Sequence, residues 1–255
     1  MTDTGILRFF APQDRVSRPS LNGTGGAEPA PDGLAPRARL VRRGHALYRA
    51  RDSFESIYMV IGGCLKDVTV LEDGRVQVTG FHMTGEIVGL DGMADAVHAS
   101  DVIALEDSYV HAIDLAQFDE PVMRPRLQEA IGRELVREHR MMVVLGSMRA
   151  DERLAAFLVD LSERLRARGL PEWELDLRMK RSEIASYLGL RIETVSRLFT
   201  RFHRAGLIRV RDKHVEILRF AELKEGATQY RPARRALSGR PRGERSRRPA
   251  PHHPP

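Results

Sequence analysis

The most regular pattern of apolar and polar positions lies between residues 192 and 205. Four apolar residues there fall at i, i+3, i+4 and i+7, the spacing that lines one side of a helix against a core. They are Val195, Leu198, Phe199 and Phe202. A shorter helix is expected from residue 181, and Gly189 predicts a tight turn between the two. The pattern therefore predicts a helix-turn-helix pair.

Two short apolar runs follow this pair, at residues 207–211 and 214–218. Gly206 precedes them as a helix stop, and Asp212-Lys213 separates them as a turn. This arrangement predicts a β-hairpin directly after the second helix. A helix-turn-helix followed by a hairpin is a winged helix, which we expect over residues 150–220.

Residues 37–119 carry the short alternating runs that are typical of β-strands. The alternating positions are Ile57, Met59 and Ile61, then Val68 and Val70, then Val76 and Val78, and last Tyr109, His111 and Ile113. Glu72-Asp73-Gly74-Arg75 lies between the second and third runs and predicts a hairpin turn. Many short strands with glycine-rich turns favour a sandwich or barrel.

A long helix is expected from about residue 126 to residue 148, within a segment 120–149 that follows Pro121 and Pro125. Its apolar stripe is narrow, which favours self-pairing of two copies over packing into the chain's own domain, although the second arrangement stays open. The stripe consists of Ile131, Leu135, Met142 and Leu145, with Met148 continuing it. The next helix opens at Asp151-Glu152 and presents a core face of Leu154, Phe157, Leu158, Leu161 and Leu165.

Composition narrows the class of protein. The 255 residues suffice for two modest domains, and no apolar run reaches the roughly 18 residues that a membrane helix needs. Residues 1–10 lack the basic start and apolar stretch of a signal peptide, so we expect a cytoplasmic protein without membrane contact. Residues 1–36 are expected to be disordered, and a basic Pro- and Arg-rich tail is expected over residues 221–255, disordered from residue 229 onward.

Charge is concentrated where the helix-turn-helix is predicted. Residues 178–214 hold ten Lys or Arg and three Asp or Glu, a balance of +7. The net charge of the whole chain, +6, is less informative, because residues 231–255 alone contribute +7. A basic helix-turn-helix is typical of proteins that bind double-stranded DNA. The candidate DNA-binding residues are Lys180, Arg191, Glu193, Ser196, Arg197, Thr200 and Arg201.

Six stretches, taken in order, resemble the Crp/Fnr family of bacterial transcription regulators. They are 42–48 (RRGHALY), 78–82 (VTGFH), 85–89 (GEIVG), 152–157 (ERLAAF), 187–190 (YLGL) and 193–197 (ETVSR). The resemblance covers roughly residues 37–220. It implies an α+β fold with a cyclic-nucleotide-binding-like β-roll, a long dimerisation helix and a C-terminal winged helix-turn-helix. It also implies a homodimer, contact with RNA polymerase, and no enzymatic activity.

Within the family, the chain is similar to the branch of the fumarate and nitrate reduction regulator, FNR. That branch carries E-x-x-S-R, matched here by Glu193, Ser196 and Arg197, whereas the cyclic-AMP receptor type has Arg before the Glu and Gly in place of the Ser. The resemblance implies the palindrome TTGAT-N4-ATCAA and control of anaerobic or nitrogen-oxide-responsive genes. Arg197 would bind guanine, Glu193 would accept from cytosine, and Ser196 would contact T·A pairs.

The expected effector differs from those of the best-known members. Relatives that bind cyclic nucleotide use a Glu and an Arg-Ser pair; here Leu90 and His98-Ala99-Ser100 stand in those places. Residues 76–123 contain nine Asp or Glu and no Lys or Arg, so we expect no cyclic nucleotide there. A [4Fe–4S] cluster needs four thiolates, and the chain has one cysteine, Cys64. His111 stands where FNR has its β-roll cysteine.

Two interpretations then stay open. The protein resembles FixK-like regulators, which work without a known small ligand, or DNR/NNR-like regulators, in which haem senses nitric oxide. Candidate haem ligands are His45, His82, His98 and His111. A third, more distant hypothesis is a cupin-like metal enzyme built on His82-x-x-x-Glu86. Its expected second histidine is absent because Thr84 stands there, and we predict no metal site.

Overall fold

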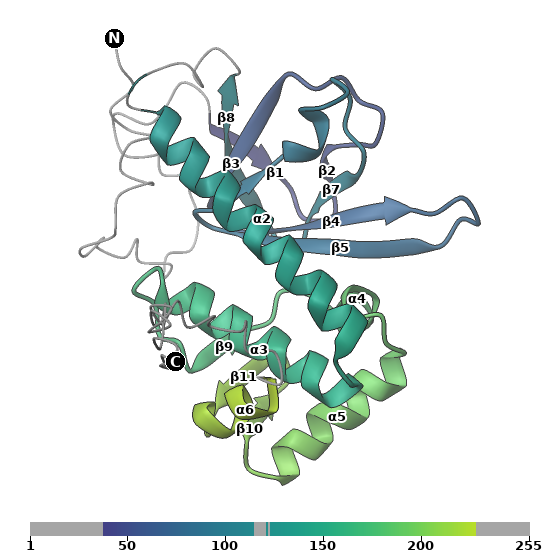
Figure 1. Ribbon diagram of the computed structural model, residues 1–255, viewed down its shortest axis with the longest axis vertical. Coiled ribbons are helices and arrows are strands. Elements are labelled where there is room, and N and C mark those ends of the chain that lie inside the picture. The colour runs from purple at the N-terminus through teal and green to yellow at the C-terminus, as the bar shows by residue number, and fades with distance from the viewer. Residues whose placement is uncertain (1–37, 115–120, 122, 228–255) are drawn as a thin grey trace, which may run out of the picture.

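The structure is a computed structural model that describes residues 38–114, 121 and 123–227. It confirms the α+β class: a β domain and a helical C-terminal domain are joined by one long helix, α2, which runs from one to the other (Figure 1). The expectations for residues 1–37, 115–120, 122 and 228–255 lie outside the described part. Among the described residues, no helix has the length and apolar character needed to cross a bilayer.

The β domain consists of two four-stranded antiparallel sheets. The first has the order β1-β8-β3-β6 and contains β1 (Ala38–Val41), β8 (Ser108–Asp114), β3 (Ser56–Gly62) and β6 (Ile87–Val88). The second has the order β2-β7-β4-β5 and contains β2 (Ala46–Tyr48), β7 (Asp101–Ala104), β4 (Cys64–Val70) and β5 (Val76–Met83). Side chains from both sheets bury one another, among them Leu47, Val60, Leu65, Val102 and Val110. Two packed sheets agree with the sandwich that the alternating runs favour and with the β-roll that the family resemblance implies.

One detail of the strand alternation was predicted wrongly. Ile57 and Met59 are fully buried, but Val60 is buried as well and Ile61 is only half-buried. The register of β3 against β8 shifts between Val60 and Gly62. A bulge of this kind inserts an extra residue and reverses which side chains face the core from that point onward. The β4–β5 hairpin was predicted correctly and extends away from the rest of the domain (Figure 1).

Helix α2 (Arg124–Ser147) has two faces of different environment. Its first face packs within the protein through Leu127, Ala130, Glu134 and Val144. The predicted seam lies on the other face: Leu135 and Met142 are 65% and 64% exposed, and Ile131 and Leu145 are half-buried. Met148 does not continue this seam, because it lies beyond the helix end and is buried inside the same chain.

The C-terminal domain is built around α3 (Ala150–Arg166). The helix pair α4 (Arg181–Tyr187) and α5 (Ile192–Arg204) lies in the chain between the first and second strands of a three-stranded sheet of order β10-β11-β9. Its strands are β9 (Glu174–Asp176), β10 (Ile208–Arg211) and β11 (His214–Ile217). A last helix, α6 (Phe220–Ala227), packs on α3 and buries Leu223. The domain therefore extends beyond residue 220, where the sequence analysis placed the start of the tail.

The two domains share an apolar and ionic contact. The rings of Phe81 on β5, Phe157 on α3 and Tyr187 on α4 cluster with centroids 5.0–6.2 Å apart. Beside them, Glu86 of the β domain binds three guanidinium groups from the helical side, those of Arg137, Arg164 and Arg168. These contacts fix how the C-terminal domain sits against the β domain.

Candidate nucleic-acid interface

Helix α5 is held by the four apolar residues that the sequence pattern singled out. Val195, Leu198, Phe199 and Phe202 are all buried, and they join the core formed by α3, α4 and the three-stranded sheet. The guanidinium carbon of Arg181 on α4 lies 3.3 Å from the centre of the Phe199 ring, a cation–π contact between the two helices. The opposite side of α5 is consequently turned to solvent.

The turn between α4 and α5 is fixed from two directions. Gly189 adopts a φ of +60°, a left-handed conformation that favours glycine. Arg153 of α3 donates from Nη1 to the Leu188 carbonyl at 3.0 Å, and from Nη2 and Nε to the Leu145 and Met148 carbonyls at 2.8 and 2.9 Å. One side chain therefore ties the end of α2 to the end of α4.

The solvent face of α5 carries the predicted base-reading residues. Glu193, Ser196, Arg197 and Thr200 are exposed, and Ser196, Arg197 and Thr200 line a depression together with Arg201 and Arg204. The Thr200 hydroxyl donates to the Ser196 carbonyl at 3.1 Å, which occupies its proton. Within the described part of the chain, Arg197 forms no ion pair. Its five donors are available to an external acceptor.

The basic residues around this face differ in their surroundings. Arg191 caps the start of α5 and is exposed. Lys180 caps α4, where its backbone N–H donates to Glu183 at 2.6 Å while its side chain stays exposed. Arg201 is engaged within the protein, because its Nη2 lies 2.8 Å from the Asp151 carboxylate at the start of α3. Burial alone would raise the pKa of Asp151, but the Arg201 hydrogen bond holds it below its ordinary value.

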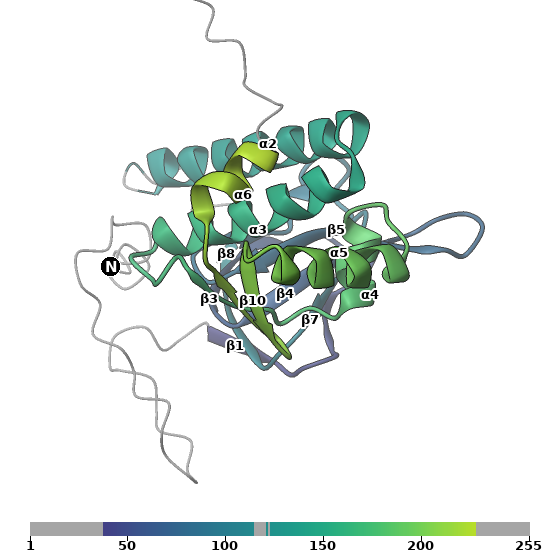
Figure 2. The same cartoon turned by 90° about the horizontal axis from the view of Figure 1, so that it is seen from below.

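The structure adds wing residues that the site prediction omitted. The turn between β10 and β11 carries Arg211 and Lys213, both exposed, with Asp212 at a φ of +52°. The recognition helix α5 and the wing strand β10 lie at the same end of the molecule, as the view from below shows (Figure 2). Arg211 and Lys213 belong to the basic residues counted between residues 178 and 214. Their exposure on a turn is seen only in the folded hairpin.

The four candidate haem histidines lie in different surroundings. His45 is exposed, with its Nδ1 3.3 Å from the Arg43 carbonyl. His82 is buried with Nε2 3.3 Å from Asp67, and His98 is buried with Nδ1 3.2 Å from Asp91. His111 is buried on β8. The two histidines with carboxylate partners are thus held by contacts within the β domain.

Cys64 and the acidic residues form no metal centre in the described ranges. No group of three or more His, Cys, Asp or Glu side chains that could hold a metal ion occurs among the residues that the structure describes. Burial raises the pKa of the Cys64 thiol to about 12. At neutral pH this side chain is therefore a protonated thiol, which is a poor nucleophile and a poor metal ligand.

Comparison with known proteins agrees with this architecture. Residues 38–124 match the model of the cyclic nucleotide-binding domain, and residues 152–225 match that of the Crp-like helix-turn-helix domain. The chain is 46% identical over 192 residues to the transcriptional regulatory protein Btr of Bordetella pertussis, covering 72% of this chain and 78% of that protein.

Two further similarities extend this picture. The transcriptional activator protein Anr of Pseudomonas aeruginosa is 42% identical over 197 residues, covering 75% of this chain and 81% of that protein. Among solved structures, FixK2 from Bradyrhizobium japonicum is similar with a TM-score of 0.65 and 27% identity, over 74% of this chain and 95% of that one.

Proposed function

Because this chain belongs to the Crp/Fnr family of DNA-binding transcription regulators, we propose that it binds the palindrome TTGAT-N4-ATCAA as a homodimer. The family and the winged helix-turn-helix establish a transcription regulator that acts on DNA. The half-site sequence and the pairing of two copies are the proposal. The observation that carries it is the solvent face of α5, on which Glu193, Ser196 and Arg197 are exposed and without ion pairs among the described residues.

The chemistry of this face suits the proposed half-site. Arg197 can donate two parallel hydrogen bonds to guanine O6 and N7, and Glu193 can accept from the amino group of cytosine. Ser196, one turn after Ile192, can contact the T·A pairs. Each such contact discriminates between bases by about 1–3 kcal/mol. Arg191, Lys180 and the wing residues Arg211 and Lys213 would bind phosphates, which positions the helix without reading sequence.

The exposed face of α2 supports the homodimer. Leu135, Val136 and Met142 are each at least 60% exposed, although all three are large and apolar. Ile131, Leu135, Met142 and Leu145 follow one another at intervals of four, seven and three residues, the spacing of a two-stranded coiled-coil seam. A two-fold axis along this seam would present two recognition helices to two half-sites about one helical turn apart.

The names of the relatives support a role in anaerobic gene control. They include an anaerobic regulatory protein from Aggregatibacter actinomycetemcomitans, 36% identical, and the fumarate and nitrate reduction regulatory protein of Vibrio cholerae, also 36% identical. We propose an activator of such genes that acts in the cytoplasm and contacts RNA polymerase. Since the sequence holds one cysteine, which is buried, we propose that it works without a [4Fe–4S] cluster.

The test is binding of the purified full chain to a labelled TTGAT-N4-ATCAA duplex and to a scrambled duplex, at one stated salt concentration. We expect tighter binding to the palindrome. Arg197→Ala should weaken binding to the palindrome by about 1–3 kcal/mol and change binding to the scrambled duplex much less. Lys213→Ala is the matched control, since a lost phosphate contact should weaken both alike. Equal losses on both duplexes for Arg197→Ala would refute the base-reading role.

A further inference from the structure

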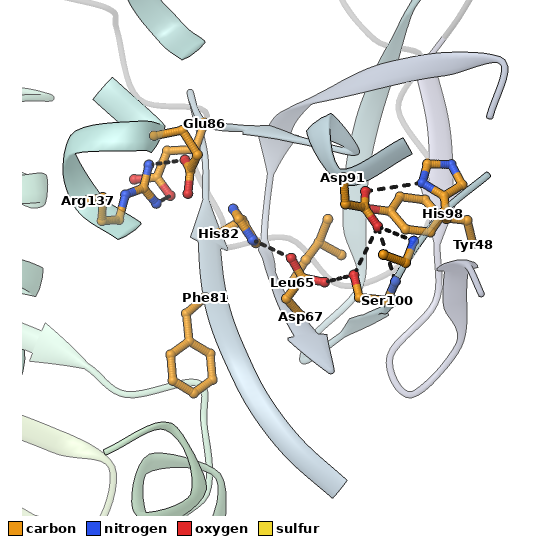
Figure 3. A network of polar contacts seen from close by, with 12 residues as sticks. Tyr48, Leu65, Asp67, Phe81, His82, Glu86, Asp91, His98, Ser100 and Arg137 are labelled. Carbon is orange, nitrogen blue, oxygen red and sulfur yellow. Dashed lines mark hydrogen bonds and ion pairs between the residues drawn. The ribbon is translucent and has the colours of Figure 1, made fainter. Parts of the chain in front are cut away.

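The carboxylate of Asp91 lies at the centre of a set of hydrogen-bond donors in the β domain (Figure 3). Its Oδ2 accepts from the backbone N–H groups of Ala99 at 2.8 Å and Ser100 at 3.1 Å. Its Oδ1 lies 3.3 Å from the Tyr48 hydroxyl and 3.2 Å from His98 Nδ1. Successive backbone N–H groups aimed at one point form an anion site. Here the anion belongs to the protein itself.

These donors come from the segment in which the fold places a nucleotide phosphate. The chain matches the cyclic nucleotide-binding domain, whose phosphate is held in relatives by an Arg-Ser pair. His98-Ala99-Ser100 stands in that place, and the Arg is missing. The Asp91 carboxylate accepts the N–H groups of Ala99 and Ser100 and lies directly beside them. A phosphate there would meet a carboxylate of the same charge sign, and the Arg that offsets such charge in relatives is missing from the segment.

The neighbouring sugar position is lined by apolar side chains. Leu90, at the place of the ribose-binding Glu, packs with Phe54 against a cluster containing Ile57 and Met59. A Cβ at Gly92 would lie 2.6 Å from the Phe54 ring, which shows how closely the ring covers this segment. The rings of Tyr48 and His98 stack with centroids 3.6 Å apart. The residues of this pocket therefore do not fit a cyclic nucleotide.

Asp91 is ionised in this setting. Burial would raise its pKa, but the hydrogen bonds from His98 and from the Ala99 and Ser100 amides outweigh burial and hold the pKa below its ordinary value. A charged acceptor is also the form that matches two backbone N–H donors. The donor set thus binds a full negative charge at neutral pH.

We propose that Asp91 is a built-in anion that permanently occupies the phosphate subsite of this cyclic-nucleotide-binding fold. The β domain is consequently self-liganded and takes no cyclic nucleotide. With the Asp91 carboxylate removed, the same donors form a vacant site for a small oxyanion of the carboxylate class. The hydrogen-bonded arrangement that a bound ligand would stabilise is therefore already formed in the free protein.

A row of polar side chains leads from the site toward the side of the domain that contacts α2. The Ser100 hydroxyl lies 2.6 Å from Asp67 Oδ1 and 3.2 Å from Asp91, and since it has one proton it donates to the nearer carboxylate. The other oxygen of Asp67 is 3.3 Å from His82 Nε2. Figure 3 shows this row of side chains between the Asp91 site and the side of the domain that carries Glu86 and Arg137. The row therefore leads from the Asp91 site as far as His82, on the side of the domain that faces the helix with the proposed dimer seam.

The test is chemical rescue of Asp91→Ala by formate, which carries the same carboxylate group without the Cβ. Thermal unfolding is measured in sodium formate and in sodium chloride of equal ionic strength. Asp91→Ala should lower Tm by about 5 °C or more, and formate should restore at least half of that loss while chloride restores none. The control is Asp95→Ala, an exposed carboxylate four residues away that should change Tm little and show no rescue. Because Tm is the readout, the outcome does not depend on DNA binding.

Two further measurements test the same proposal independently. If Asp91→Ala does not fold, Asp91→Asn replaces it, because the amide keeps the shape and loses the charge; a Tm equal to that of the wild type would overturn the proposal. Calorimetric titration of the wild type with cyclic AMP should give no binding heat, and saturable binding would overturn it too. Equal effects of formate and chloride on Asp91→Ala would likewise overturn it.

Discussion

Glu86→Gln is expected to destabilise the fold more than any exposed charge substitution on α2. Glu86 Oε2 lies 2.5 Å from Arg164 and 3.0 Å from Arg137, and its Oε1 accepts from Arg164 Nε at 2.9 Å and binds Arg168. The side chain of Glu86 is 11% exposed, and those of its three partners are 12–18% exposed. Glutamine keeps the shape but removes the countercharge that the three guanidinium groups share, while Arg137 keeps Glu134 and Arg164 keeps Asp160 as partners.

The magnitude follows from this geometry. Removing one partner of a buried ion pair costs about 3–5 kcal/mol when a buried charge is left uncompensated. The retained pairs Arg137–Glu134 and Arg164–Asp160 place the expected loss at the lower end of that range. Burial would raise the pKa of Glu86, but Arg164, Arg137 and Arg168 together hold it well below its ordinary value. A depressed folded-state pKa contributes stability above the unfolded pKa of about 4.3, and this stability is lost as the pH falls below that value. The difference between wild type and Glu86→Gln should therefore shrink by about 1.4 kcal/mol per pH unit there.

The assay is urea unfolding followed by circular dichroism and by the fluorescence of Trp173, the one tryptophan of the chain. The matched control is Glu129→Gln. Glu129 also forms an ion pair, 2.6 Å from Arg133 on α2, but both of these side chains are more than half exposed. That substitution should cost about 0.3–0.5 kcal/mol. Equal losses for the two variants, or a Glu86→Gln difference that does not change between pH 5 and pH 3, would refute the reasoning.

Three further predictions concern other sites. Met142→Glu should convert a dimer to a monomer in sedimentation experiments, because a carboxylate would enter the apolar seam; a dimer of unchanged stability would exclude that seam. Burial lowers the pKa of His82, but Asp67 and Glu134 raise it by more, so that the pKa lies above its ordinary value. The protonated His82 therefore contributes its full stabilisation below pH about 6.5, and this stabilisation is lost as the pH rises through the raised pKa. The stability of wild type relative to His82→Gln should accordingly fall between pH 6 and pH 8.5 in urea unfolding, and a constant difference would count against it. Cys64, whose pKa burial raises to about 12, should resist iodoacetamide in the native protein at pH 8, as mass spectrometry can show; labelling within minutes would contradict this.

The sequence predicts well those elements whose residues report on their own local geometry. The stripe Val195, Leu198, Phe199 and Phe202 fixes both the helix and its buried side, so the residues between them had to be exposed. The β4–β5 hairpin is equally local, since the turn and both strands lie within twenty residues. Periodicity fails for short elements: β9 has three residues with one buried side chain, and the eight residues of α6 show their role only in packing Leu223 onto α3.

Partners that are distant in the sequence could not be predicted from it. Arg201 stands on the recognition helix by its spacing, yet only the folded chain brings Asp151 to within 2.8 Å of it. Arg153 was part of a family-like stretch, but its three carbonyl acceptors lie on α2, directly after α2 and directly after α4. In each case the sequence identifies a residue of the right chemistry. The fold decides whether that chemistry faces DNA or the protein.

In the acidic segment 76–123, the contacts made in the fold change the functional interpretation of the sequence. Nine carboxylates without a Lys or Arg predict a negative pocket that repels phosphate by its field. In the structure, two of these carboxylates are already bound by donors of the protein itself. Glu86 is bound by three arginines of the helical side, and Asp91 by the Ala99 and Ser100 amides, His98 and Tyr48. The proposal for Asp91 keeps the expectation that no cyclic nucleotide binds but gives it another physical cause, namely that the donors for the phosphate already bind Asp91.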